Sequence, residues 1–170
     1  MKLSKKIKRR NYTKAGWLLF YLYIILLSYF LFFSERYGRS CISDDYRYNL
    51  DFLKEIRRFI IYRNKLSVES FVVNILGNIL AFAPYGFFLS LLNKRYRSSL
   101  SITILSILFS LTVEVVQMLM KVGVFDVDDI LLNSLGGILG YLTFKLYAWI
   151  RKRIEKKGAG KGGVEYGKKR

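Results

Sequence analysis

The chain has 170 residues, of which 52% are hydrophobic, and it carries a formal net charge of +17 with no histidine. The length suggests one domain, and the lack of histidine argues against histidine-based zinc sites and nucleophile triads. No recognisable nucleic-acid-binding module accompanies the positive charge, so the position of the charges along the chain decides what they mean.

Four apolar runs dominate the sequence, at residues 17–33, 71–92, 99–120 and 130–150. A helix needs about 20 apolar residues to cross the hydrocarbon core of a bilayer, and all four runs fall within the usual range. The first run is longer than the hydrophobic part of a cleaved signal peptide, and no small-residue cleavage pattern follows it. The sequence therefore predicts an all-α membrane protein with four transmembrane helices in up-down-up-down order.

Lys and Arg are concentrated in alternate connections. Seven precede residue 17, three lie in residues 93–98 and nine follow residue 150. The other two connections, residues 34–70 and 121–129, carry eight and one, offset by six and three acidic residues. Because positive residues collect on the cytoplasmic side, we expect both termini in the cytoplasm. Most of the charge is then an orientation signal that favours anionic lipid headgroups, and nucleic acid is not an expected partner.

Three regions follow from this pattern. Residues 17–150 form the transmembrane domain, and residues 1–16 form a basic cytoplasmic tail. Residues 151–170 are rich in Gly and Lys with little to bury, which predicts a second basic tail without fixed structure.

The outer connection between the first two helices contains an amphipathic stretch, NLDFLKEIRRFII, at residues 49–61. Leu53, Ile56 and Ile60 share one helical stripe. This spacing predicts a helix lying flat on the outer membrane surface, as a connector or as a lid over polar residues below it.

Polar residues recur at similar depth near the outer ends of three predicted helices. Glu114 is the most informative, because an ionised side chain inside a membrane costs roughly 2.5–3.5 kcal/mol on insertion scales and needs a partner or a use. We expect its carboxylate to point at Asn74, Asn78 and Asn133 inside the bundle. The predicted ligand pocket comprises Asn74, Asn78, Glu114, Gln117, Asp126, Asp129 and Asn133.

Plainer interpretations of these residues remain open. Glu114 and Gln117 can serve as hydrogen-bonding glue between helices, and Asp126 fits the N-cap of the fourth helix. A carboxyl in apolar surroundings can also act as a general acid or base, and Glu114 is the candidate catalytic residue. No cofactor or metal is expected, with a minor alternative of Mg²⁺ or Ca²⁺ held by Glu114, Asp126 and Asp129.

Small residues and one proline predict close helix packing. Residues at four-residue spacing let two helix backbones approach, and a proline inside a helix removes a backbone hydrogen bond and kinks it. The predicted packing residues are Gly77, Ala81, Pro84, Gly86, Gly136, Gly137 and Gly140.

Three blocks resemble the VanZ-like family of bacterial membrane proteins: NILGNILAFAPYGFFL, SLTVEVVQ and FDVDDILLNSLGGILGYL. The outer-loop dipeptide Asn49-Leu50 is similar to a further family stretch, although the proline of that stretch is absent here. The resemblance implies a four-helix protein of the bacterial cell membrane, and the namesake is associated with lowered susceptibility to teicoplanin. The matching positions are Asn78, Phe82, Pro84, Gly86, Glu114, Gln117, Asp126, Asp129, Asn133, Gly136 and Gly137.

We weigh three functions. The first is a non-enzymatic envelope protein whose outward-facing pocket binds a membrane lipid, a lipid-linked wall precursor or a lipoglycopeptide. The second is an intramembrane enzyme on the same substrates, with Glu114 as general base and Asp126 and Asp129 as helpers. The third is a small transporter subunit, which is less favoured because the polar residues occupy one leaflet. The sequence leaves the ligand and the oligomeric state open.

Overall fold

The computed structural model describes residues 2–33, 45–61 and 72–162. Within these ranges four helices are long and apolar enough to cross a membrane: Thr13–Phe33, Asn74–Leu92, Ser99–Leu119 and Val127–Lys157. The predicted all-α membrane fold with four spanning helices is confirmed.

The described elements follow one another in a simple order. They are α1 (Lys2–Phe33), β1 (Arg47–Asn49), α2 (Lys54–Ile61), the π-helical turn η2 (Val72–Leu76), α4 (Gly77–Leu92), the 3-10 turn η3 (Lys94–Tyr96), α5 (Ser99–Leu119), β2 (Val124–Asp126) and α6 (Val127–Gly162). The two short strands pair in parallel, with Arg47, Tyr48 and Asn49 opposite Val124, Phe125 and Asp126.

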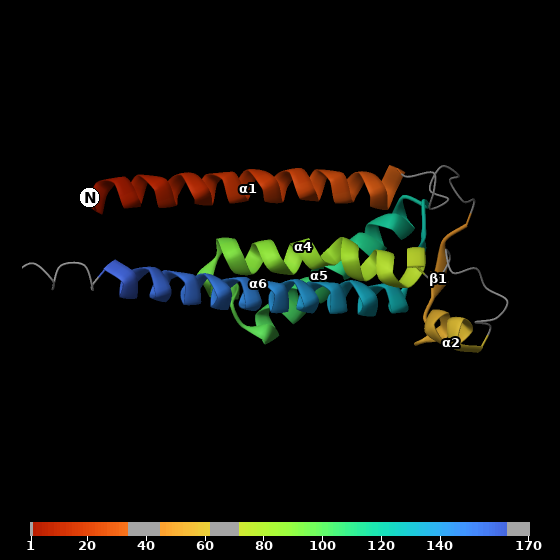
Figure 1. Ribbon diagram of the computed structural model, residues 1–170. Coiled ribbons are helices and arrows are strands. Elements are labelled where there is room, and N and C mark those ends of the chain that lie inside the picture. The colour runs from red at the N-terminus through yellow and green to blue at the C-terminus, as the bar shows by residue number, and fades with distance from the viewer. Residues whose placement is uncertain (1, 34–44, 62–71, 163–170) are drawn as a thin grey trace, which may run out of the picture.

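The helices run side by side along one axis (Figure 1). The start of α1 and the end of α6 lie at one end of the bundle, and β1 and α2 lie at the other. We call the end that carries β1, β2 and α2 the strand end. The flat helix predicted over residues 49–61 is shorter than expected, because residues 47–49 form a strand and α2 begins at Lys54. The side chain of Ile60 lies outside the described part.

Helices α1 and α6 extend beyond the predicted spans. The sequence predicts tails at residues 1–16 and 151–170, whereas α1 begins at Lys2 and α6 continues to Gly162. In α6, Arg151 Nε donates to Glu155 Oε1 at 3.0 Å, and the Arg153 guanidinium lies 3.9 Å from the centre of the Trp149 ring. Contacts between residues four apart support a helix that composition alone does not reveal. Residues 163–170 of the second predicted tail lie outside the described ranges.

Helices α4 and α6 make the most extensive contact in the bundle. A Cβ atom added to any of three glycines would overlap a backbone oxygen across this contact: Gly136 with Ile79, Gly140 with Ala83, and Gly86 with Gly137. Because a methyl group does not fit, glycine at these positions sets the short distance between the two backbones.

The α4 side of this contact differs from the prediction. Gly86, one of the predicted packing residues, does meet α6, but the other backbone atoms of α4 that meet it belong to Ile79 and Ala83 and not to the predicted pair Gly77 and Ala81. Ala81 instead packs against the cluster of Leu27, Phe82 and Val113, and its carbonyl accepts a hydrogen bond from the Tyr23 hydroxyl at 2.7 Å. A helix turns 100° per residue, so a shift of two positions moves the contact to another face.

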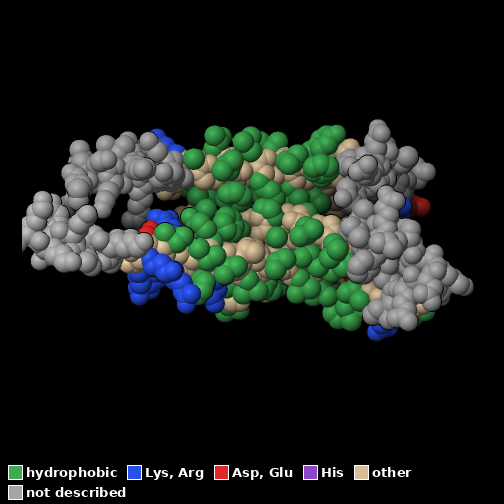
Figure 2. Space-filling model, in the orientation of Figure 1, with side chains coloured by type: hydrophobic (Ala, Val, Ile, Leu, Met, Phe, Trp, Pro, Cys, Tyr) green, Lys and Arg blue, Asp and Glu red, His purple; other side chains and the backbone are tan. Residues whose placement is uncertain are grey.

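Two apolar clusters lie between the helices, around Phe82 with Leu27 and Val113, and around Ile102 with Tyr141 and Phe144. Many large apolar side chains instead point outward, including Ile25 and Leu100, which are 66% and 70% exposed. On the face shown in Figure 2, hydrophobic side chains cover the middle of the molecule. An extended surface of outward-facing apolar side chains is typical of a surface that contacts a membrane.

Replacing Gly140 with Ala tests the α4–α6 contact. The added methyl would overlap the Ala83 carbonyl oxygen, and we expect a loss of about 1–3 kcal/mol of unfolding free energy, the usual range for overpacking. Thermal or denaturant unfolding in detergent measures this loss. Leu139→Ala, at a partly exposed position on the same helix, is the control and should remain near wild type. Equal stability of Gly140→Ala and wild type would contradict the close contact.

Candidate functional site

Glu114 lies near the end of α5 and is only 2% exposed. Its Oε2 accepts a hydrogen bond from the backbone N–H of Asp126 at 3.0 Å. Gln117, one turn later and 1% exposed, donates from Nε2 to the carbonyl oxygen of Leu31 in α1 at 2.8 Å. Both buried polar side chains therefore bond to the backbones of other elements, which joins α5 to β2 and to α1.

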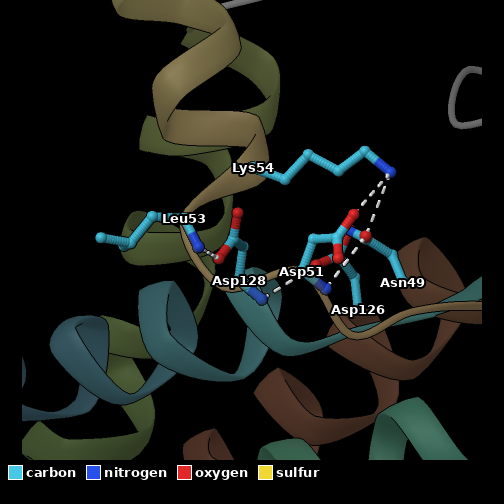
Figure 3. Close-up of polar contacts among 6 residues, drawn as sticks. All are labelled: Asn49, Asp51, Leu53, Lys54, Asp126 and Asp128. Atoms are coloured by element: carbon cyan, nitrogen blue, oxygen red, sulfur yellow. Dashed lines mark hydrogen bonds and ion pairs between the residues drawn. The ribbon is translucent and has the colours of Figure 1, made fainter.

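Asp126 is the centre of the polar contacts at the strand end (Figure 3). It is the last residue of β2 and immediately precedes α6. Its Oδ1 accepts from the backbone N–H of Asp128 at 2.8 Å, the geometry of an N-cap residue. Its Oδ2 accepts from Asn49 Nδ2 at 3.0 Å, and Asn49 is its partner in the strand register. The expected N-cap role is present, and the same carboxylate also holds β1 against β2.

Asp128 is fully buried, and its Oδ1 accepts a hydrogen bond from the backbone N–H of Leu53 at 2.6 Å. Leu53 has a φ of 61°, in the left-handed region that most L-residues avoid. The buried carboxylate holds this unfavourable turn, which leads directly into α2. In Figure 3 the turn that carries Leu53 lies against the start of α6.

A second left-handed residue lies on the other side of β2. Lys121, which follows the end of α5, has a φ of 57°, where glycine is usual after a helix. Its ammonium group lies 5.0 Å from the centre of the Tyr46 ring, just before β1. Strained backbone of this kind persists only where surrounding contacts enforce it, and it often marks functional regions.

Two further amides lie deeper in the bundle. Asn78 Nδ2 of α4 donates to Asp129 Oδ1 of α6 at 2.5 Å, and Asn133 Nδ2 of α6 donates to Ser110 Oγ of α5 at 2.8 Å. Within the described residues, the buried Asn133 Oδ1 and Ser106 Oγ have no hydrogen-bond partner.

The predicted pocket residues are thus divided among separate bonds. The sequence predicts that Glu114 points at three asparagines. In the structure its carboxylate accepts from the backbone N–H of Asp126. Two of the asparagines have other partners: Asn78 bonds to Asp129, and Asn133 bonds to Ser110. Asn74 is exposed, in the π-helical turn before α4.

Sequence reasoning did not identify Asp128 or Lys54 as partners in this network, and it noted Asn49 only through its resemblance to a family motif. The N-cap role of Asp126 was indicated by its position before the fourth helix, whereas no local pattern indicates the bond from Leu53 to Asp128.

The described residues contain no group of three or more Cys, Asp or Glu side chains placed to hold a metal ion. The minor alternative of a Mg²⁺ or Ca²⁺ site at Glu114, Asp126 and Asp129 therefore has no geometric support. Asp128 and Asp129 instead lie in the first turn of α6, where the positive end of the helix dipole favours negative charge.

Next to the polar contacts lies an open hollow of about 580 Å³ alongside α2. Its lining combines cationic and apolar side chains with one carboxylate: Asp51, Phe52, Lys54, Arg57, Arg58 and Ile61. We call it the α2 hollow. Lys54 connects it to the polar contacts, because Lys54 Nζ donates to Asn49 Oδ1 at 3.2 Å and Asn49 in turn bonds to Asp126.

These features define a four-helix membrane protein whose buried carboxylates organise the segments at one end of the bundle. The sequence profile of the VanZ/LLP1 family matches residues 20–149. Since this match covers well over half of the chain, the chain belongs to that family.

Among curated proteins, the chain is similar to Protein VanZ of Enterococcus faecium, with 30% identity over 82 residues. The aligned segment is 48% of this chain and 48% of that protein, so the match spans about half the length of the relative. No solved structure matches the chain.

Replacing Asp126 with Ala tests its central position. The change removes the N-cap acceptor of α6 and the acceptor for Asn49, and loss of an N-cap alone costs about 0.5–2 kcal/mol. We expect faster amide hydrogen exchange in residues 47–49 and in the first turn of α6, measured by mass spectrometry. Asp51→Ala is the control, because the pair that this carboxylate forms with Lys54 at 3.6 Å is exposed. Equal exchange in Asp126→Ala and wild type would show that the carboxylate does not hold the strands together.

Proposed function

We propose that this protein is a multi-pass component of the bacterial cell membrane that binds an amphiphilic envelope molecule at its strand end. The candidate ligands are a membrane lipid, a lipid-linked wall precursor and a lipoglycopeptide. Both termini lie in the cytoplasm, so the strand end faces outward. The protein acts by binding and does not transform the ligand.

The distribution of charge supports this orientation. Exposed Lys and Arg residues gather at the end where α1 begins and α6 ends (Figure 2), which is the end opposite β1 and α2. They include the loop residues Lys94, Arg95 and Arg97 and the α6 residues Arg151, Lys152, Arg153, Lys156 and Lys157. Positive residues of short connections and tails remain on the cytoplasmic side during insertion.

The observation that carries the proposal is the mixed lining of the α2 hollow, where cationic and apolar side chains lie beside the ends of the spanning helices. An amphiphile at a membrane surface presents a polar headgroup next to apolar chain, and this lining complements both. The contacts from Glu114 through Asp126 and Asn49 to Lys54 support a fixed platform for it. Pre-positioned binding groups lower the ordering cost of association.

The enzymatic alternative has less support. A general base needs access to a substrate proton, and Glu114 is buried with one oxygen bonded to the Asp126 N–H. In this proposal Glu114 positions the strand end and does not contact the ligand. The resemblance to the teicoplanin-associated namesake makes glycopeptide susceptibility a suitable cellular readout of ligand binding.

Two substitutions of Glu114 test the proposal. Glu114→Ala removes the acceptor for the Asp126 N–H, and we expect the folded protein to lose at least tenfold in affinity for lipids that co-purify with wild type. Glu114→Gln retains a carbonyl acceptor, so we expect it to keep most of that binding. Native mass spectrometry of the purified proteins measures the bound lipid. Thr112→Val is the control on the same helix, because the exposed Thr112 hydroxyl donates to the Leu108 carbonyl within that helix.

Unchanged binding by a folded Glu114→Ala protein would contradict the role assigned to Glu114. A ligand that wild type alters chemically and Glu114→Gln leaves intact would favour the enzymatic alternative. A reporter that is active only outside the cell can be fused to the carboxyl terminus. Activity of this fusion would contradict the proposed cytoplasmic position of that terminus.

A further inference from the structure

Helix α2 presents one cationic face to the α2 hollow. Lys54, Arg57, Arg58 and Ile61 all line the hollow, and their spacing of three, four and seven residues places them on one side of a helix. Among the described residues, three cations and one carboxylate line the hollow, so this described lining has an excess of positive charge. The hollow therefore favours an anion.

The chemistry of the cations favours a phosphate group. The arginine guanidinium is planar and presents a fork of N–H donors that matches the oxygens of phosphate, and it stays charged at all physiological pH values. Arg57 and Arg58 supply two such groups from the same turn of α2. Lys54 adds a third cation, whose ammonium group contacts Asn49 Oδ1 at 3.2 Å and Asp51 Oδ2 at 3.6 Å.

Apolar side chains lie at both ends of this cationic row. Phe52 and Ile61 are 57% and 68% exposed and both line the hollow. A free inorganic anion would gain nothing from them, whereas the first carbons of a lipid chain would bury apolar surface against them. The combination indicates a headgroup that is joined to a hydrocarbon chain.

Resting on the proposed binding function, we infer that the ligand is a phosphate-bearing lipid and that the α2 hollow receives its headgroup. Arg57 and Arg58 contact the phosphate oxygens, Lys54 adds positive charge, and Phe52 and Ile61 cover the start of the lipid chain. Binding at this site differs from the non-specific electrostatic attraction between basic tails and anionic membranes, because it depends on particular side chains of α2.

Binding of three probes to the full-length protein in dodecyl maltoside micelles tests this inference. Farnesyl diphosphate has both a phosphate headgroup and a hydrocarbon chain. Farnesol has the chain without the phosphate, and inorganic diphosphate has the phosphate without the chain. We expect farnesyl diphosphate to bind at least tenfold more tightly than either of the others by titration calorimetry. We expect Arg57→Gln combined with Arg58→Gln to lower its affinity at least tenfold, and Arg57→Lys to have a smaller effect because it keeps charge but loses the fork.

The control separates a specific site from general charge. Lys152→Gln combined with Lys156→Gln removes two exposed cations from α6 at the opposite end of the bundle, and we expect it to leave the affinity unchanged. The inference would be overturned if this control lost as much affinity for farnesyl diphosphate as the α2 double variant. It would also be overturned if the α2 double variant bound this probe within twofold of wild type.

The probes also separate this inference from the proposed function. Farnesol binding as tightly as farnesyl diphosphate would overturn the phosphate assignment and leave an amphiphile-binding protein. Inorganic diphosphate binding as tightly as farnesyl diphosphate would identify the ligand as a free anion, which contradicts a lipid source. The failure of all three probes to bind would contradict both proposals. The substituted arginine side chains are exposed, and circular dichroism checks that each variant keeps the helical fold.

Discussion

A carboxylate within a membrane-spanning segment must find hydrogen-bond donors, and in this protein Glu114 finds one in the backbone N–H of Asp126. That bond fixes the end of β2 against α5, close to the point where α6 begins. The side chain of Asp126 then caps α6 and holds Asn49, which brings β1 into register with β2. Because these contacts share Asp126, the arrangement of the strand end depends on Glu114.

The same contacts explain why unfavourable backbone is tolerated at this end. Leu53 adopts a left-handed conformation because the buried carboxylate of Asp128 accepts its N–H. This turn directs α2 along the end of the bundle and exposes its cationic row to the α2 hollow. The bundle itself is held differently, by glycine contacts between α4 and α6 that leave no room for a methyl group. The helices thus provide the support, and the segments between them form the surface of the proposed binding site.

Hydropathy and length were sufficient to predict the four spanning helices, because membrane insertion imposes a simple minimum length of apolar sequence. The glycines of α6 were also recognisable from their spacing. On α4 the sequence indicated Gly86 but not Ile79 or Ala83, because Gly77 with Ala81 is an equally plausible pair of small residues and only tertiary packing selects the face. The parallel pairing of Asn49 with Asp126 joins residues 77 apart in the sequence, and local patterns contain no information about such contacts. For the same reason, the depth of Glu114 indicated that it needed a partner but did not identify a backbone N–H.

The most direct test of the account is amide hydrogen exchange of residues 45–54 in lipid nanodiscs, compared among wild type, Glu114→Ala and Glu114→Gln. If Glu114 organises the strand end, this segment exchanges slowly in wild type, much faster in Glu114→Ala, and at close to the wild-type rate in Glu114→Gln, which keeps an acceptor. Equal exchange in all three proteins would contradict the claim that the buried carboxylate holds the strand end together.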